Sequence, residues 1–421
     1  MYSFDWRGDF RAWLARVRHG SSWRQVAPNV WFLGVTSLLT DISSEMVASI
    51  LPLYLVVTLG MSPFMFGVID GLYPGITALV RWFGGIAGDR TRRHKELAAA
   101  GYAVSAISRL AWLIVGGNPT GIAATVTADR MGKGIRTAPR DAMISLSSPP
   151  GDLGQSFGVH RAMDAAGAML GPVTAFVLLA VAPQRFDLIF VASFGMGVVG
   201  LAVLLLFVRN QPGPAASAAA ARRTGGQLWI LLRQRRVWAA IAASAALAAV
   251  TVSDAFIYLT LQRQGLVAAG AIPLLYVGTN CVYLLLAVPF GALSDRVARW
   301  KVFLAGHALL VVIYLLLLVP ELAPIGVGAV LILLGGYYAA TDGVLPALVS
   351  AVLPPDLRGS GLGLVATAVS LARLVASVAF GWLWSAWGGP AALAIFAAAM
   401  PLAIAGSAWA LHRAERGIIA A

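Results

Sequence analysis

The stretch Gly85-Ile-Ala-Gly-Asp89-Arg90-Thr-Arg-Arg93-His-Lys95 occurs a second time, as Gly291-Ala-Leu-Ser-Asp295-Arg296-Val-Ala-Arg299-Trp-Lys301. Glycine, aspartate, two arginines and lysine hold the same places in both copies. Further along the chain, a second pair of matching stretches is separated by nearly the same number of residues as the first pair, which indicates a duplicated chain. It pairs Pro149, Pro150, Gly154 and Gly158 with Pro354, Pro355, Gly359 and Gly363.

Long apolar stretches surround both copies of the motif. A bilayer core about 30 Å thick needs roughly 20 mostly apolar helical residues to cross it. Twelve stretches fit, so the sequence predicts an all-α polytopic membrane protein with twelve transmembrane helices in two pseudo-symmetric six-helix bundles. The predicted spans are 29–58, 65–88, 97–116, 119–146, 154–181, 187–208, 237–261, 270–293, 302–319, 324–352, 360–384 and 389–411.

The composition agrees with this fold class. Apolar residues make up 59% of the 421 residues and charged residues 12%, whereas an ordinary globular chain is roughly 25% charged. A disordered chain and a soluble enzyme are therefore excluded. The formal charge of +13 raises the question of nucleic acid, but so apolar a chain has little solvated face for that partner, and none is expected. The single cysteine, Cys281, suggests no metal or cofactor.

The domain organisation follows from the spans and the segments between them. The first segment carries aromatic residues on one helical face and is expected to lie on the membrane surface. The middle segment is rich in Pro, Gly and Ala and is typical of a linker. We predict a cytoplasmic amphipathic segment at 1–28, bundles at 29–209 and 237–412, a cytoplasmic linker at 210–236 and a cytoplasmic tail at 413–421.

The orientation is predicted from the basic residues, which concentrate in cytoplasmic loops of membrane proteins. With both termini in the cytoplasm, the loops on the opposite side hold only Arg185 and Arg263. The sequence therefore predicts a multi-pass protein of the cell inner membrane, with both motif copies on the cytoplasmic side.

The repeated motif is similar to the Gly-x-x-x-Asp-Arg-x-x-Arg-Arg loop motif of the major facilitator superfamily, and the chain resembles transporters of that family over nearly its whole length. The resemblance implies a motif that holds the cytoplasmic side shut. Asp89 would contact the start of the eleventh span near Gly359, and Asp295 the start of the fifth near Gly154, where a helix dipole favours an anion. The expected gate residues are Gly85, Asp89, Arg90, Arg93, Arg140, Asp141, Gly291, Asp295, Arg296 and Arg299.

Two further patterns resemble features of antiporters in this family. Gly167, Gly171 and Pro172 match part of a fifth-span antiporter motif, although GxxxG is also an ordinary helix-packing device. Arg130 and the glycines after it resemble a fourth-span motif of proton antiporters, to which a proton-transfer role is attributed.

Charged side chains inside the hydrocarbon region are costly and are candidates for function. Equal numbers of basic and acidic residues fall within the predicted spans, so they are expected to pair. The basic ones are Arg81, Arg109, Arg130, Lys133, Arg136, Arg140, Arg161 and Arg373, and the acidic ones Asp41, Glu45, Asp70, Asp129, Asp141, Asp164, Asp254 and Asp342.

Helical spacing divides these charges into candidate roles. Arg130, Lys133, Arg136 and Arg140 form a stripe that cannot face lipid. Asp41 and Glu45 are one turn apart, and two carboxylates in a low dielectric oppose each other's ionisation, so that one can exchange a proton. The proton-coupling candidates are Asp41, Glu45, Asp70, Asp164 and Arg130, each of which could instead form a static ion pair. The substrate-cavity candidates are Arg130, Lys133, Arg161, Asp254, Asn280, Tyr337, Tyr338, Asp342 and Arg373.

The sequence thus predicts a monomeric secondary transporter in the lipid bilayer that moves a small organic solute by alternating access. The antiporter-like motifs favour proton-coupled efflux. The alternative is a proton-coupled symporter that imports an anionic metabolite held by Arg130 and Lys133, and the basic stripe favours an anionic or zwitterionic substrate. A remote alternative is a non-transporting membrane sensor or lipid-handling protein.

Overall fold

The computed structural model describes residues 26–91, 93–149, 152–210, 235–320, 323–353 and 358–419; the side chains of 82–91, 235–236, 352, 358–360 and 414–419 are outside this description. The predicted segment 1–28 and the linker 210–236 therefore lie almost wholly outside the described residues. The last helix continues to Ile419, through most of the tail expected at 413–421.

The twelve predicted spans are confirmed as helices, and the described residues form no strands. Four spans are composite, because a helix is broken or changes its winding within the span. The first half contains α2 (Pro28–Pro52) continued by the π-helix η2 (Leu53–Thr58), α3 (Pro63–Thr91), α4 (His94–Val115), α5 (Pro119–Ser147), α6 (Leu153–Val181) and α7 (Phe186–Phe207). The second half contains α9 (Arg235–Ala249) with α10 (Asp254–Arg263), the 3-10 turn η3 (Ala269–Ala271) before α11 (Ile272–Arg296), α12 (Arg299–Leu317), α13 (Ile325–Thr341) with α14 (Val344–Val352), α15 (Arg358–Trp387) and α16 (Gly389–Ile419).

Eleven of these spans are long and apolar enough to cross a membrane by composition alone. The remaining helix is α5, which carries the predicted basic stripe and whose charges lower its hydropathy. Its polar face is buried against the other helices of its half. A helix of this composition is stable in a membrane only when protein surrounds its charges.

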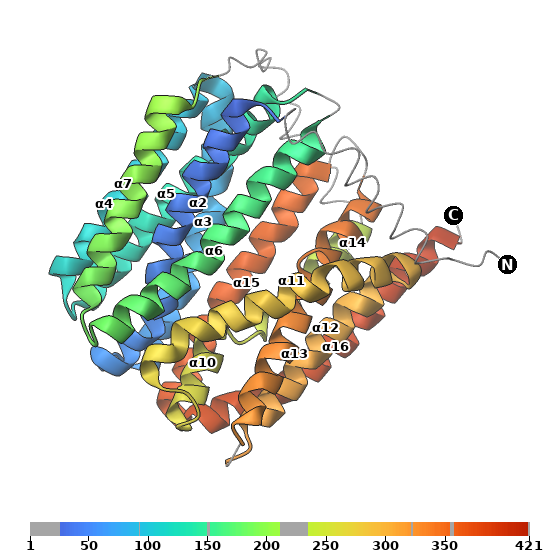
Figure 1. Cartoon of the computed structure of the whole chain (residues 1–421). Coiled ribbons are helices and arrows are strands. Elements are labelled where there is room, and N and C mark those ends of the chain that lie inside the picture. Colours follow the sequence, from blue (N-terminus) through green and yellow to red (C-terminus); the bar gives the residue numbers. More distant parts are fainter. Residues whose placement is uncertain are drawn as a thin grey trace.

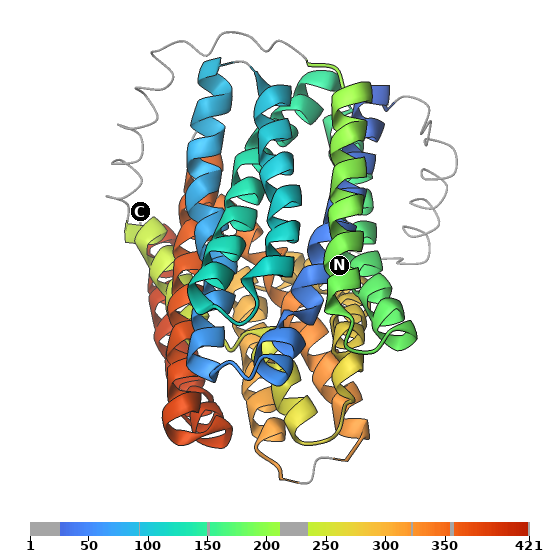
Figure 2. The same ribbon diagram turned by 90° about the vertical axis from the view of Figure 1, so that its left-hand side faces the viewer.

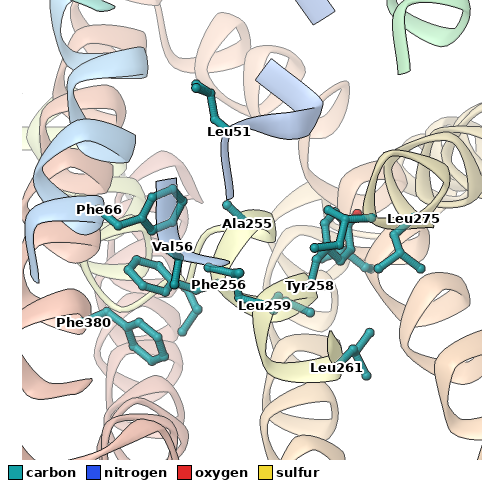
Figure 3. Packing of buried hydrophobic residues seen from close by; sticks show 14 of the residues in the cluster. Leu51, Val56, Phe66, Ala255, Phe256, Tyr258, Leu259, Leu261, Leu275 and Phe380 are labelled. Carbon is teal, nitrogen blue, oxygen red and sulfur yellow. The ribbon is translucent and has the colours of Figure 1, made fainter. Parts of the chain in front are cut away.

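The helices form two bundles, α2 to α7 in blue to green and α9 to α16 in yellow to red (Figures 1 and 2). One hydrophobic cluster contains residues of both bundles. In it the ring of Phe256 on α10 lies 5.1 Å from Phe66 on α3 and 4.9 Å from Phe380 on α15 (Figure 3). We call this the joined end of the molecule.

At the opposite end, where α2 begins and α16 ends, the halves have separate cores. One cluster there contains only first-half residues such as Leu33 and Tyr102, and another only second-half residues such as Ile241 and Val365. We call this the termini end. Among the described side chains, each apolar cluster confined to this end belongs to one half, so the described apolar contacts between the halves concentrate at the joined end.

Glycines hold α3 against α15 across the two halves. Gly67, Gly71 and Gly75 follow one another at four-residue spacing on one face of α3. A Cβ added at Gly71 would lie 2.9 Å from the carbonyl oxygen of Leu374 on α15. Small residues at this spacing let helix backbones approach closely in a membrane, so the glycines define the joint between the halves.

We expect G71L to lower the apparent melting temperature of the purified protein, because its side chain would meet the backbone of α15. Overpacking of this kind costs about 1–3 kcal/mol. Gly195 on α7 has open space around its Cβ position, so G195L is the matched control in the same thermal-unfolding assay. Equal melting of the two variants would contradict the close packing of α3 on α15.

Candidate functional site

A cavity of about 460 Å³ lies between the two halves. Both bundles contribute to its wall, and its size is that of ordinary small-molecule sites, roughly 300–1,000 Å³. Its polar and aromatic lining consists of Glu45, Phe66, Asp70 and Tyr73 from the first half and Thr251, Ser253, Asp254, Tyr276, Tyr338 and Arg373 from the second.

The break between α9 and α10 forms one wall of the cavity. Residues Thr251 to Ser253 are not helical, although they lie in the middle of a membrane span. The freed backbone N–H of Val252 donates to the hydroxyl of Tyr314 at 2.9 Å. Irregular backbone is tolerated at membrane depth where it lines a cavity or is buried in protein, and here it places Asp254 at the start of α10.

Two cavity carboxylates lie where the halves meet. Asp70 on α3 accepts a hydrogen bond from the hydroxyl of Ser377 on α15 at 2.6 Å, a bond from one half to the other. Asp254 accepts from the hydroxyl of Tyr338 at 2.8 Å. Within the described part of the chain, neither carboxylate has a basic side chain at ion-pair distance.

The third cavity carboxylate, Glu45, is shared with the basic stripe of α5. Its Oε1 lies 3.8 Å from Nζ of Lys133. The same ammonium lies 4.0 Å from Oδ1 of Asp41, which in turn lies 3.8 Å from the guanidinium of Arg136. Asp41 and Glu45 therefore share one cation, and only Glu45 reaches the cavity wall.

The start of the stripe is held by a buried aspartate. Asp129 pairs with Arg109 at 2.7 Å and with Arg130, its neighbour in sequence. Arg109 is only 2% exposed. The guanidinium of Arg130 also lies 4.2 Å from the ring centre of Tyr73, whose side chain reaches the cavity. Arg130 itself is thus directed into the first half and does not line the cavity.

The end of the stripe forms a second ion-pair cluster. Arg140 lies 3.0 Å from Asp141 and 3.5 Å from Asp164. Ser37 on α2 donates to Asp164 at 2.7 Å. Arg161, 69% exposed at its side chain, lies 3.9 Å from Asp164. Every basic residue of the stripe therefore faces at least one carboxylate, which removes the free positive charge that favoured an anionic ligand.

The glycines of the antiporter-like motif bring α6 against α2. A Cβ added at Gly167 would lie 2.5 Å from the carbonyl oxygen of Leu38, and one at Gly171 would lie 2.8 Å from Cβ of Glu45. Pro172 follows inside α6 and is buried. The motif thus fixes the distance between α6 and the face of α2 that carries Asp41 and Glu45.

Of the remaining candidates in the second half, only Arg373 lines the cavity. The guanidinium of Arg373 donates to the hydroxyl of Tyr337 at 3.2 Å, and the Tyr337 ring packs on His307 at 5.3 Å. Asn280 is half-buried on α11, and Asp342 is exposed at the end of α13. Tyr337, Asn280 and Asp342 do not line the cavity.

In the second copy of the gate motif, the aspartate pairs within its own half. Asp295 is 68% exposed at its side chain and pairs with Arg299 of its own motif at 3.1 Å. The space around Gly154 is open, so the expected contact of Asp295 with the fifth span is not formed in this conformation. Of the other gate candidates, Arg93 directly precedes α4 and Arg296 is the last residue of α11. A Cβ added at Gly291 would meet no described atom within 4 Å. Gly85, Asp89 and Arg90 are outside the described side chains.

The sequence did not single out Arg109, Asp129, Tyr73, Tyr276 or Ser377 as site residues. The sequence did identify Arg109 and Asp129 as charges within the predicted spans. The position of Asp129 next to Arg130 could have indicated that the two form an ion pair. Tyr73, Tyr276 and Ser377 carried no such signal, because only the packing of helices from both halves brings them to the cavity.

We expect D129N to destabilise the protein strongly, because it leaves Arg109 and Arg130 buried without their shared carboxylate. Removing one partner of a buried ion pair costs about 3–5 kcal/mol. The control is D187N, which removes the partner of Arg185 in an exposed pair and should cost at most about 1 kcal/mol. Thermal unfolding of the detergent-purified variants measures both; similar losses would contradict the central place of Asp129.

The chain matches the family model described as Major Facilitator Superfamily over residues 33–279 and again over 267–418. An uncharacterized MFS-type transporter of Methanocaldococcus jannaschii is 32% identical over 372 residues, which cover 86% of this chain and 89% of the relative. An uncharacterized protein of Mycobacterium tuberculosis is 25% identical over 368 residues, covering 86% of this chain and 87% of the relative.

Solved structures show the same fold at low sequence identity. The nucleoside transporter NupG aligns with a TM-score of 0.75 at 12% identity, covering 91% of this chain and 98% of that one. A mutant of a peptide transporter, POT, aligns with a TM-score of 0.76 at 15% identity, covering 93% and 95%. With a family match over both halves and a relative above 30% identity along most of its length, the chain belongs to the major facilitator superfamily and is a membrane transporter of that type.

Proposed function

We propose that this transporter couples the export of a small organic solute to proton entry across the inner membrane, with both termini in the cytoplasm. The observation that carries the proposal is the solute-sized cavity between the halves, with carboxylates of both halves in its wall. A site near the middle of the membrane, between two halves that rock, is the arrangement used by secondary transporters.

The orientation rests on the basic residues. The loops at the joined end hold only two of them, and cytoplasmic loops carry the excess of Lys and Arg. The termini end is then cytoplasmic. In this proposal a solute enters the cavity from the cytoplasm, because no described apolar cluster confined to that end joins the halves.

Asp70 and Glu45 are the carboxylates best placed for proton coupling among the four acidic candidates. The ionised Asp70 accepts from Ser377 across the joint of the halves, and a hydrogen bond to a charged group contributes about 1.5–3 kcal/mol. A proton on Asp70 weakens that bond. A proton on Glu45 removes its attraction to Lys133. Both changes loosen contacts around the cavity, which lets the halves rock.

Asp41, Asp164 and Arg130 play a supporting part in this proposal. Each is paired inside the first half and does not line the cavity. They would hold α5 and α6 in place while Glu45 and Asp70 exchange protons with the aqueous side. The joint between the halves lies within one chain, which is consistent with a working monomer.

The alternative of symport with an anionic metabolite requires Arg130 and Lys133 to bind the solute. Both face carboxylates instead, and neither is among the residues that line the cavity. The pairing therefore favours efflux driven by protons over anion import. Transport in everted compared with right-side-out vesicles tests the direction.

We expect D70N and E45Q each to abolish proton movement driven by solute while leaving the protein folded. The assay is the fluorescence of a pH dye inside proteoliposomes, challenged in turn with tetraphenylphosphonium, uridine, alanyl-alanine and benzoate. D187N is the control and should behave as the unmodified protein, because its ion pair is exposed and distant from the cavity. If no probe moves protons in the unmodified protein, or if both variants retain full proton movement, the coupling is refuted.

A further inference from the structure

The cavity wall carries more negative than positive charge. Its ionisable acids are Glu45, Asp70 and Asp254, and Arg373 is its one basic residue within the described lining. The basic stripe of α5 does not restore the balance. Arg130 is buried against Asp129, and Lys133 is already shared by two carboxylates. A ligand that enters from water therefore meets an excess of carboxylate.

Asp70 and Asp254 have hydroxyl partners, but no described basic side chain lies at ion-pair distance from either of them. A carboxylate out of water is costly unless a positive charge compensates it. The hydroxyls of Ser377 and Tyr338 each supply one hydrogen bond, which leaves the charge itself unopposed by any described basic side chain at ion-pair distance. One of the two carboxylates belongs to each half, so a positive ligand between them would interact with both.

The arrangement does not suit a metal ion. A metal needs several acidic or imidazole ligands around one point, and the described residues contain no group of three His, Cys, Asp or Glu side chains placed to hold one. The carboxylates are instead distributed around a cavity of about 460 Å³. Such spacing suits a cation whose charge is carried on a larger organic body.

Aromatic rings supply the surface for that organic body. Phe66, Tyr276 and Tyr338 line the cavity together with Tyr73, whose ring already stacks on Arg130. The rings of Tyr and Phe attract cations through their negative faces and bury apolar area as well. Arg373 donates to the hydroxyl of Tyr337 and interacts with Asp254 only beyond ion-pair distance.

We propose that the substrate is an organic cation with an aromatic or otherwise apolar body, bound between Asp70 of the first half and Asp254 of the second. This rests on the proposed transport function and names its substrate class. The cation supplies the ion-pair partner that neither carboxylate has among the described residues, and its body fills the aromatic part of the cavity.

Two probes of the same shape and opposite charge test the charge preference. Tetraphenylphosphonium and tetraphenylborate are titrated separately against the purified full-length protein in detergent, with quenching of tryptophan fluorescence as the signal. We expect the cation to bind and the borate to bind at least about tenfold more weakly, the ratio that about 1.4 kcal/mol produces. No proton gradient is present, so this measurement is independent of coupling.

Variants then locate the binding site. We expect D70N and D254N each to weaken binding of the phosphonium by about tenfold or more, and D187N to leave it unchanged. R373Q removes the one positive charge of the lining and should bind the phosphonium at least as tightly. Circular dichroism of each variant confirms that it is folded, and the R373Q result remains informative if an aspartate variant is not.

The outcomes separate this inference from the proposed function. Four outcomes would each overturn the cation site. The first two are tighter binding of the borate than of the phosphonium, and loss of borate binding in R373Q. The other two are phosphonium binding that neither D70N nor D254N changes, and no binding of the phosphonium at all. If proton movement then follows only uridine, alanyl-alanine or benzoate, coupled transport stands and the substrate class is wrong. If the phosphonium binds at the aspartates while no probe moves protons, the cation site stands and the coupling is wrong.

Discussion

The pairing of charges inside the first half is the constraint on which the rest of the structure depends. A helix as polar as α5 survives in a membrane because Asp129 opposes Arg109 and Arg130 while Asp41, Glu45, Asp141 and Asp164 oppose the remainder of the stripe. These partners lie on α2, α4, α5 and α6. The need to meet them fixes how those helices pack, and it turns the polar face of α5 towards its own bundle.

The two halves use their charges differently although they share one ancestral pattern. The first half is stabilised by ion pairs that are closed within the bundle. The second half has fewer charges at membrane depth, and it leaves Asp254 with a tyrosine hydroxyl as its partner. Together with Asp70 at the joint, this difference makes the cavity between the halves acidic, because Asp70 and Asp254 line it with no described basic side chain at ion-pair distance.

Glycines and helix breaks set the distances between helices that the ion pairs do not determine. Gly71 brings α3 against α15, and Gly171 brings α6 against the carboxylates of α2. The interruption before Asp254 opens the wall of the cavity, while Tyr314 compensates the exposed backbone. In the proposed cycle, the close backbone contacts of α3 and α15 are the joint about which the two halves rock.

The sequence by itself determined the number, length and order of the helices, because membrane thickness and hydropathy act locally along the chain. It also predicted that the α5 stripe could not face lipid and that the intramembrane charges would pair, since an unpaired charge in lipid is costly. Only the tertiary structure decided which acid meets which base, that Arg130 turns inward while Glu45 faces the cavity, and that Asp70 bonds to Ser377 more than 300 residues away. Those choices depend on how helices from both halves cross in space, and distance along a chain carries no information about that crossing.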